Sequence, residues 1–297
     1  MRKVMYFVEY ALLRFVVGIL TRIPQGLASR MGATLGGLGY SPLGIRREVV
    51  DANLLRAFPE KDDAWRRDVA RKSYEHLGRE IIAMLRLSHL DEAEIMRQTS
   101  FTDRDQADEL FRAKGKGAVI VVGHFGNWEL GAATMATRGY PLDVIAKRQK
   151  NPYFDHYIVA ARNRLGVRII ERSRAPKEGL RSLRQGRVVV FGADQNAGRG
   201  GVFVPFFGHL ASTHRGAALM AIRTGAPVIM ALPRRLPDGT YCTVVEVIEP
   251  NPESIHEENE IAMEILTARF TKRLEEEIRK YPDQYLWHHR RWKTPPP

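Results

Sequence analysis

The chain contains a single cysteine among its 297 residues, and this scarcity excludes two kinds of structure. One thiol cannot form an intrachain disulfide or a cysteine-based zinc cluster, and such a composition suits a reducing compartment. Cys242 stands in the β-rich run YCTVVEVI, with no activating partner near it in the sequence. We therefore predict a buried structural thiol there rather than a nucleophile.

Long uninterrupted apolar runs are lacking too. The N-terminal stretch VMYFVEYALLRFVVGIL, residues 4–20, is apolar except at Glu9 and Arg14. A membrane span needs about 20 mostly apolar residues, and a secretory signal needs an unbroken apolar run with a small-residue cleavage site. A core helix, an interfacial helix and a short anchor with a snorkelling Arg14 stay open, and the aromatic residues favour membrane contact.

Several common signatures of catalysis are missing from the sequence. There is no Gly-x-Ser-x-Gly elbow for a serine nucleophile, and the glycines in NAGRGG are not followed by the Lys-Ser/Thr of a phosphate-binding loop. His288 and His289 are adjacent, so they cannot present both rings to one ion as residues four apart on a helix do. We expect neither a metal nor a bound cofactor.

Acidic residues are few relative to basic ones. The 46 lysines and arginines exceed the 34 aspartates and glutamates, which gives a formal charge of +12. Such an excess predicts acidic partners, namely an anionic membrane surface, a phosphorylated substrate or an acidic carrier protein. A long basic block with interleaved aromatics would indicate nucleic acid, and the basic residues here are scattered instead. We therefore expect no nucleic-acid partner.

Helical periodicity dominates the first third of the chain, and strands alternate with helices after it. In residues 45–90 the apolar residues recur at helical spacing, with Pro59 ending one helix and Asp62 or Asp63 capping the next. The alternation predicts βαβ units and a mainly parallel sheet. A PDG turn precedes YCTVVEVIEP, which is predicted as an added edge strand, antiparallel as one option. The other predicted strands span 117–122, 143–147, 167–170, 187–191 and 226–232.

These patterns predict an α/β fold with a mainly parallel central sheet flanked by helices. We expect residues 1–44 to form a membrane-associated helix or hairpin, with GLASRMGATLGGLGY packing on the first helix, and residues 45–297 to form the α/β domain with a helical segment leading into it. The run GVFVPFFG is predicted as core for about half of its length, with the alternative that it lines a channel for a hydrocarbon chain or dips into a bilayer. Thr213 is predicted to start a helix, and Ser254 with Glu257 to cap the last one. That last helix would bury Ile261, Ile265, Phe270, Leu274 and Ile278.

The segment that carries chemistry is 123–129, GHFGNWE, directly after the first strand of the sheet. Ligands gather at the carboxyl ends of strands in such folds, which is where His124 falls. Asn127 is a good N-cap that puts Glu129 in the first helical turn, and a turn at Gly126 can fold His124 back so that Glu129 reaches its ring. A carboxylate on one imidazole nitrogen fixes the tautomer and leaves the other nitrogen as a general base.

The alternative interpretation is a satisfied strand-end histidine, with Glu129 interacting with the helix dipole. The two glycines, the strand before His124 and the helix after it favour catalysis. Because no protein nucleophile is evident, the base would activate a substrate hydroxyl directly, and the acyl or other group would pass to it without a covalent enzyme intermediate.

At this point the residues resemble a family, the bacterial lipid A biosynthesis acyltransferases, which include lauroyl and myristoyl transferases within the lysophospholipid acyltransferase-like superfamily. The superfamily pattern of His, four residues and an acid fits His124 and Glu129. The resemblance covers roughly residues 1–293, including the N-terminal apolar helix and the ending WHHRRWK. Three further blocks make it specific: AKRQKNPYFD at 146–155, ARNRLGVRII at 161–170 and ADQNAGRGGVFVPFFGHLASTHRGAALMAIRTGAPVI at 193–229.

The resemblance implies transfer of an acyl chain from acyl carrier protein to a hydroxyl of a phosphorylated glycolipid, a lipid A precursor, at the cytoplasmic face of the inner membrane. His124 would be the base and Glu129 its partner. The acyl donor would be a co-substrate and not a cofactor. The residues expected to bind substrate or shape the site are Asn127, Arg148, Arg164, Asp194 and Gln195.

Two alternatives stay open. One is an acyltransferase for another glycolipid, an aminolipid or a lysophospholipid, with acyl-coenzyme A as donor. The other is a non-catalytic membrane- or nucleic-acid-binding protein of the same fold, against which the intact His124–Glu129 motif argues. Acyl chain length, the accepting hydroxyl and the oligomeric state are not determined by the sequence.

Overall fold

The computed structural model describes residues 2–105, 108–109, 117–248 and 260–297. Its helices are α1 Arg2–Leu20, α2 Gln25–Tyr40, α3 Arg47–Ala57, α4 Asp63–Leu87, α5 Glu92–Gln98, α7 Trp128–Thr137, α8 Pro152–Arg164, α9 Ala175–Arg184, α10 Gly216–Thr224 and α11 Glu260–Lys280. Its strands are β1 Thr99–Phe101, β2 Ala118–Val122, β3 Leu142–Ala146, β4 Arg168–Glu171, β5 Val188–Gly192, β6 Val202–Phe206, β7 His209–Thr213, β8 Val228–Arg235 and β9 Tyr241–Ile248.

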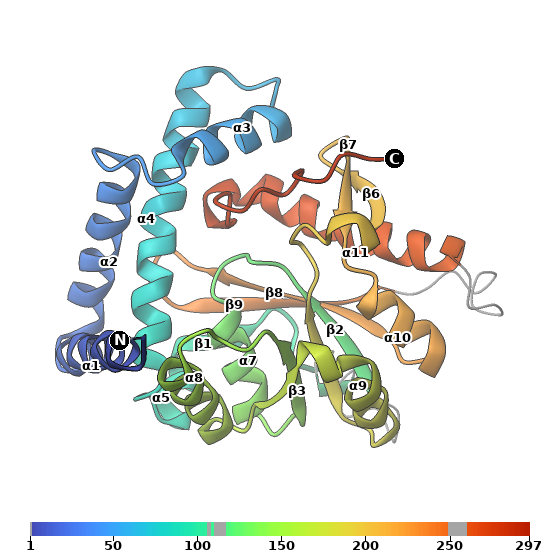
Figure 1. Ribbon diagram of the computed structural model, residues 1–297, viewed down its shortest axis with the longest axis horizontal. Coiled ribbons are helices and arrows are strands. Elements are labelled where there is room, and N and C mark those ends of the chain that lie inside the picture. Colours follow the sequence, from blue (N-terminus) through green and yellow to red (C-terminus); the bar gives the residue numbers. More distant parts are fainter. Residues whose placement is uncertain (1, 106–107, 110–116, 249–259) are drawn as a thin grey trace.

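A central sheet runs in the order β1-β9-β8-β2-β5-β3-β4. Figure 1 shows this sheet among the surrounding helices. All of its pairs are parallel except β8 with β9, which confirms the predicted mainly parallel α/β fold. The strand β9 is antiparallel to β8 but is not the edge of the sheet, because β1 pairs with its outer side. The short β1 comes from the chain before the first predicted strand, and three residues show no periodicity that a sequence pattern can detect.

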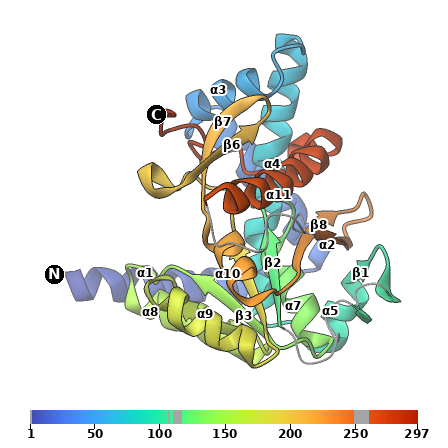
Figure 2. The same cartoon turned by 90° about the vertical axis from the view of Figure 1, so that its right-hand side faces the viewer.

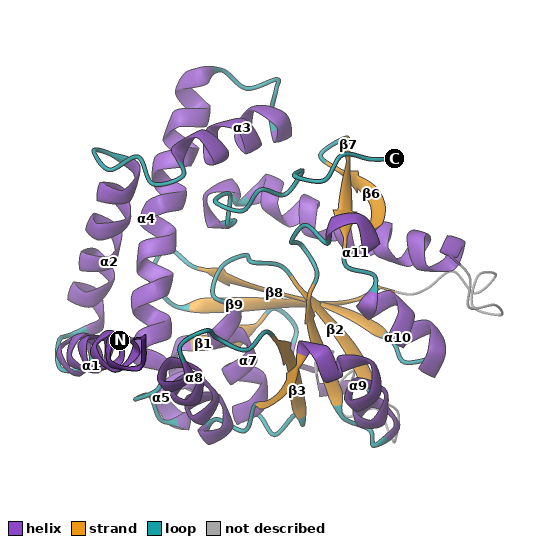
Figure 3. Ribbon diagram, viewed as in Figure 1, coloured by secondary structure: helices purple, strands orange, loops and turns teal. Residues whose placement is uncertain are grey.

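Helices cover both faces of this sheet (Figure 3). The alternation of side chains along β2 shows which helices cover each face. Val119 and Val121 join the larger core cluster, to which α9, α10 and α11 contribute. Ile120 points to the other face, into a cluster with Met135 of α7. Burial on both faces explains the continuous apolar runs of the central strands, since parallel strands covered by helices lose the alternating pattern.

The helices α2 and α4 approach each other closely at glycines. A Cβ on Gly36 would lie 2.0 Å from the carbonyl oxygen of Tyr74, and one on Gly78 would lie 2.0 Å from that of Gly32. The backbones therefore touch directly, as they do where small residues recur four apart on a helix. The expected hairpin of α1 with α2 is not formed, since α2 lies along α4, while α1 contacts α4 and α8.

The N-terminal helices expose many apolar side chains. Among the described residues no helix combines the length and the apolarity that crossing a membrane requires. The division of the chain at residue 44 stays a prediction. The exposed apolar side chains are Val4, Met5, Phe7, Val8, Leu12, Phe15, Val16 and Ile19 on α1, Leu27, Met31, Leu35 and Leu38 on α2, and Leu43 and Ile45 after it.

Some predictions for individual caps and buried residues are confirmed, and others are not. Asp62 caps α4 as predicted, since its side chain accepts from the Trp65 amide at 2.7 Å, and Cys242 is buried. The predicted cap at Ser254 and Glu257 lies outside the described residues. In α11, Phe270, Leu274 and Ile278 are buried as expected, but Ile261 is 67% exposed, because it stands in the first described turn beyond the edge of the core.

The run GVFVPFFG forms a strand of the hairpin β6–β7, which pairs antiparallel apart from the main sheet. The hairpin stands apart from the central sheet (Figure 2). Phe207 is buried and contacts Phe58 and Trp287. Phe206 is buried and contacts Tyr285 and Trp292, so the buried part of this run is core. The prediction that Thr213 starts a helix is wrong. Thr213 ends β7, and its hydroxyl accepts from the buried Arg291, so α10 begins only at Gly216.

Candidate active site

The loop between β2 and α7 presents His124 at the carboxyl end of the sheet. Gly126 has φ +56°, and a Cβ there would lie 1.6 Å from the carbonyl oxygen of Pro233, so only glycine fits. The Asn127 side chain accepts from the Leu130 amide at 2.8 Å and caps α7. The predicted turn and cap are both present. Two further backbone bonds fix the loop, from the Gly126 amide to Gln284 and from the Leu286 amide to His124.

The carboxylate that binds His124 is Asp194, where the sequence had predicted Glu129. Asp194 Oδ1 lies 2.7 Å from His124 Nδ1, and Oδ2 accepts from the His124 backbone amide at 2.9 Å. Asp194 is 5% exposed and follows β5, which pairs with β2 in parallel register up to Val122 and Gly192. Because parallel neighbours end at the same edge of the sheet, the residue just after β5 reaches the residue just after β2.

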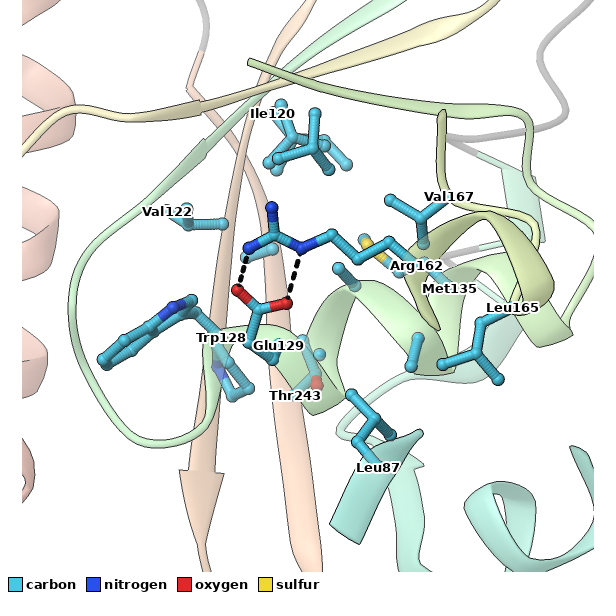
Figure 4. A pocket seen from close by; sticks show the side chains of 17 residues that line it. Leu87, Ile120, Val122, Trp128, Glu129, Met135, Arg162, Leu165, Val167 and Thr243 are labelled. Atoms are coloured by element: carbon cyan, nitrogen blue, oxygen red, sulfur yellow. Dashed lines mark hydrogen bonds and ion pairs between the residues drawn. The ribbon is translucent and has the colours of Figure 1, made fainter. Parts of the chain in front are cut away.

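Glu129 instead forms a bidentate ion pair with Arg162 of α8 (Figure 4). The Arg162 Nε donates to Oε2 at 2.9 Å, and a second guanidinium nitrogen donates to Oε1. Among the residues that the structure describes, no hydrogen bond joins the His124 and Glu129 side chains. The first turn of α7 directs Glu129 toward α8, although its charge still acts on the imidazole from a distance.

The buried carboxylate sets the protonation of the imidazole. Burial lowers the pKa of His124, but the charge of Asp194 and its hydrogen bond outweigh burial and raise that pKa above its ordinary value. Burial likewise raises the pKa of Asp194, yet the charge and hydrogen bonds of His124 bring it down to about 2. Asp194 is therefore ionised, and Nδ1 carries the proton that it accepts. In the neutral ring Nε2 is then an acceptor, and the Gln195 amide nitrogen lies 3.2 Å from it.

His124 opens onto a cavity of about 550 Å³ with a mixed wall. The indole of Trp128 stands edge-on to the imidazole, with ring centroids 4.9 Å apart. Basic and polar side chains of this wall are Lys147, Gln149, Arg162, Arg172, Gln195, His214 and Arg223. Its apolar side chains are Val122, Val144, Ile145, Leu180, Val190, Phe191, Leu219 and Met220. A site with these surfaces can hold a ligand that combines anionic groups with hydrocarbon.

A narrow apolar pocket of about 60 Å³ adjoins this cavity (Figure 4). The ion pair of Glu129 and Arg162 stands where the two spaces meet, because both side chains line both of them. Trp128 also lines both. The inner part of the narrow pocket is formed by hydrocarbon side chains from α4, β2, α7 and the chain after α8, namely Leu87, Ile120, Met135, Leu165 and Val167.

The other predicted substrate-binding residues fall in different places. Gln195 and Asp194 surround His124 as described. Asn127 is 1% exposed and serves the start of α7, since besides capping it donates to Glu80 Oε2 at 2.8 Å. Arg148 is exposed, lies 3.5 Å from Asp155 and is not part of the cavity wall. Arg164 donates to the carbonyl oxygens of Leu87 and Leu90 at 3.3 and 3.0 Å, which ties α8 to α4.

Sequence reasoning missed Arg162 and Trp128. Arg162 lies in the same block as Arg164, and residues two apart on a helix point about 200° apart, so only one of the two can face the cavity. The helical spacing gave no reason to prefer Arg162, because both arginines flank apolar positions. Among the described residues no three histidine, cysteine or acidic side chains are arranged to hold a metal ion.

Comparison with known proteins gives a consistent picture. A family model described as bacterial lipid A biosynthesis acyltransferase matches residues 1–294. The chain is 28% identical to the lipid A biosynthesis lauroyltransferase of Escherichia coli K12, covering 95% of this chain and 90% of the relative. It is 26% identical to the lipid A biosynthesis palmitoleoyltransferase of the same strain, covering 97% and 93%. It is also 28% identical to a phosphatidylinositol mannoside acyltransferase of Mycolicibacterium smegmatis, covering 70% and 69%.

Proposed function

The chain belongs to the bacterial lipid A biosynthesis acyltransferase family and is an acyltransferase, and on this premise we propose that it moves a fatty acyl chain from an acyl-carrier-protein thioester to a hydroxyl of a lipid A precursor. The observation that carries the proposal is His124, held by the buried Asp194 at the edge of a cavity with basic and apolar walls. That wall suits a substrate pair in which phosphates and hydrocarbon chains occur together.

In the proposed reaction His124 acts as the general base. The acceptor hydroxyl takes the place of the Gln195 amide at Nε2 and gives its proton to that nitrogen as its oxygen attacks the thioester carbonyl carbon. The tetrahedral intermediate collapses with cleavage of the carbon–sulfur bond, and the imidazolium returns the proton to the leaving thiolate. The Asp194 carboxylate stabilises the imidazolium between these steps. No covalent enzyme intermediate is needed.

We propose that the acyl chain of the donor enters the narrow apolar pocket past the ion pair of Glu129 and Arg162. Most of the pocket wall consists of apolar side chains, so burial of methylene groups there is favourable. The bidentate pair fixes both side chains at the junction of the two spaces. Glu129 is in this view a positioning residue, which places Arg162 against the donor instead of orienting the imidazole.

The charge of the protein supports acidic partners for the same site. Lys147 and Arg172 are exposed at the cavity, where they are able to bind phosphates of the acceptor or acidic residues of a carrier protein. The formal charge of +12 adds a general attraction to such partners and to anionic lipids.

We further propose that the N-terminal helices lie on the cytoplasmic face of the bacterial inner membrane. The exposed apolar side chains of α1 and α2 support this, because water-exposed hydrocarbon on this scale is unusual in a monomeric soluble protein. Removal of residues 1–24 should shift the protein from the membrane to the soluble fraction after cell lysis. A full-length protein that is found in the soluble fraction would contradict the proposal.

A second acceptor class is favoured by one comparison. The similarity to a phosphatidylinositol mannoside acyltransferase extends over 70% of the chain, so an acceptor other than a lipid A precursor is the alternative. The alternative donor is acyl-coenzyme A. Both activities would use the same base and the same cavity.

The decisive experiment offers purified protein each donor with each acceptor. Acyl-carrier-protein and acyl-coenzyme A thioesters would be paired with a lipid A precursor and with a phosphatidylinositol mannoside, and products identified by mass spectrometry. We expect an added acyl group on the lipid A precursor from the carrier-protein donor. Transfer only to the mannoside would establish the alternative, and transfer to neither would contradict both.

A further inference from the structure

A second pocket, of about 200 Å³, lies between α2, α4, α5 and the turn that joins β8 to β9. None of the residues on its wall lies on the reaction cavity or on the narrow apolar pocket. Its wall is formed by Gln25, Ala28, Ser29, Arg79, Ile82, Ala83, Arg86, Leu90, Glu94, Gln98, Leu130, Arg235, Gly239 and Tyr241. The proposed acyl transfer gives this pocket no role.

Three arginines on the wall are weakly neutralised. Arg79 is 3.6 Å from Glu75 and Arg235 is 3.7 Å from Glu80, distances too long for close hydrogen-bonded pairs. Arg86 donates to the carbonyl oxygens of Leu20 and Ile23, and within the described part of the chain it forms no ion pair with a carboxylate.

Two arginines elsewhere in the protein are neutralised more closely. Arg168 and Arg187 both form bidentate pairs with the buried Asp143. The pocket arginines have no comparable hydrogen-bonded partner. Burial lowers the pKa of Arg86, while the charge of Glu94 on the same wall acts in the opposite direction. Such an arrangement is costly unless an anion completes it.

The acidic groups near the pocket offset only part of this charge. Glu94 stands on the wall, where it accepts from the Gln98 amide at 2.6 Å and pairs with the exposed Arg97. Glu80 lies behind Tyr241, whose hydroxyl donates to it at 2.8 Å. Burial raises the pKa of Glu80 to about 7, so near neutral pH it carries only part of a negative charge.

We propose that this pocket binds the phosphate group of an anionic ligand at a site separate from the acyl-transfer centre. Guanidinium groups match phosphate oxygens with paired hydrogen bonds, and Ser29 adds a hydroxyl that already accepts from Arg235 at 3.1 Å. The phosphate comes either from a lipid headgroup or from a free metabolite. A lipid source fits the exposed apolar row of Leu27, Met31 and Leu35 on α2, which starts next to the pocket residues Ala28 and Ser29.

Arg79→Gln is the best test variant, because Arg79 is partly exposed and its one ion pair is long. Arg86 supports the turn between α1 and α2, and Arg235 faces Glu80, which holds Asn127, so changes at either would disturb other contacts. Arg67→Gln is the matched control. It removes the same charge from the same helix at an exposed position outside the pocket.

The experiment is isothermal titration calorimetry of the full chain in non-ionic detergent with three probes: inorganic phosphate, glycerol 3-phosphate and short-chain phosphatidic acid. We expect Arg79→Gln to weaken binding of at least one probe by about tenfold or more, as for loss of a charged hydrogen bond, while Arg67→Gln leaves it unchanged. Arg172→Gln, in the reaction cavity, separates binding at that site from binding here. Sensitivity of all three probes indicates a free phosphate ligand, and sensitivity of phosphatidic acid alone indicates a lipid.

Ser29→Glu provides a second, independent variant. A carboxylate at this position would pair with Arg235 and occupy the pocket, so it should weaken the same probe as Arg79→Gln does. Circular dichroism checks that each variant is folded. If no probe binds more weakly to either folded variant than to Arg67→Gln, the proposal is overturned. The measurement needs no acyl transfer, so its outcome is independent of the proposed reaction.

Discussion

Two carboxylates stand near the same imidazole, and they differ in what neutralises them. Asp194 is buried and bound to His124, a group that gains and loses a proton near neutral pH. Glu129 is bound in bidentate fashion to Arg162, whose charge is permanent. The first pair responds to proton transfer, and the second holds a fixed geometry. A carboxylate that lies near a catalytic histidine is therefore not necessarily the one that orients and stabilises its imidazole.

The largest effect is expected for the base that both carboxylates surround. His124→Ala should reduce acyl transfer about a thousandfold or more, because the variant lacks the imidazole that Asp194 holds ready to accept the proton of the acceptor hydroxyl. Initial rates with a radiolabelled donor measure it. The melting temperature should stay near that of the unchanged protein. If the folded variant keeps more than a small fraction of the activity, His124 is not the general base.

The next effect concerns the acid bound to that base. Asp194→Asn should lower kcat about a hundredfold or more, since the amide keeps the size of the side chain but no longer stabilises the imidazolium or fixes its tautomer. KM should change little. Steady-state kinetics of Asp194→Asn and Glu129→Gln show which variant loses more kcat. A larger loss of kcat in Glu129→Gln would mean that Glu129, and not Asp194, supports the base.

A smaller loss of activity is expected for variants of the ion pair between Glu129 and Arg162. Glu129→Gln and Arg162→Gln should each reduce kcat/KM about tenfold through misplacement of the donor, and the double variant should be little worse than either one. Donors of several acyl lengths should be tested, because the pair stands at the mouth of the narrow pocket. Additive losses in the double variant would show that the two residues act separately.

The smallest effect is a displacement of the pH profile. Transfer needs neutral His124, so kcat/KM should fall as the pH drops through the raised pKa of that residue. Removing the charge of Asp194 lowers this pKa, so the acidic limb of Asp194→Asn should move to lower pH. Glu129→Gln should move it in the same direction by less, since Glu129 acts without a hydrogen bond. Measurements of kcat/KM from pH 5 to 9 test this. Equal shifts of the acidic limb in the two variants would contradict the different roles of Asp194 and Glu129.

Much of this site follows from the sequence because it depends on local chemistry. The strand before His124, the turn at Gly126 and the cap at Asn127 are local features, and each has a residue-level signature that predicted it correctly. The order of the parallel strands in the sheet is harder to predict from the sequence than these local features. The pairing of β5 with β2 is what brings Asp194 to His124, and that adjacency joins segments about 70 residues apart.

The parts of the fold that escaped prediction share a physical cause. The strand β1 is too short for a periodic signal, and it changes β9 from an edge strand into an inner one. The glycines of α2 were predicted to belong to a weakly apolar segment that packs on the first helix. They instead allow a close backbone approach to α4, which cannot be inferred without the partner helix. The ion pair between Glu129 and Arg162 likewise depends on how α7 and α8 pack against each other. The residue spacing within either helix does not predict this packing.

The backbone bonds of the His124 loop also bear on biosynthesis. Residues 284 and 286 hold this loop, and β8 flanks β2, although all of them leave the ribosome long after His124 does. A nascent chain that already displays the histidine therefore lacks the partners that orient it. We therefore expect a chain that ends before residue 284 to lack an ordered His124 loop and to be inactive.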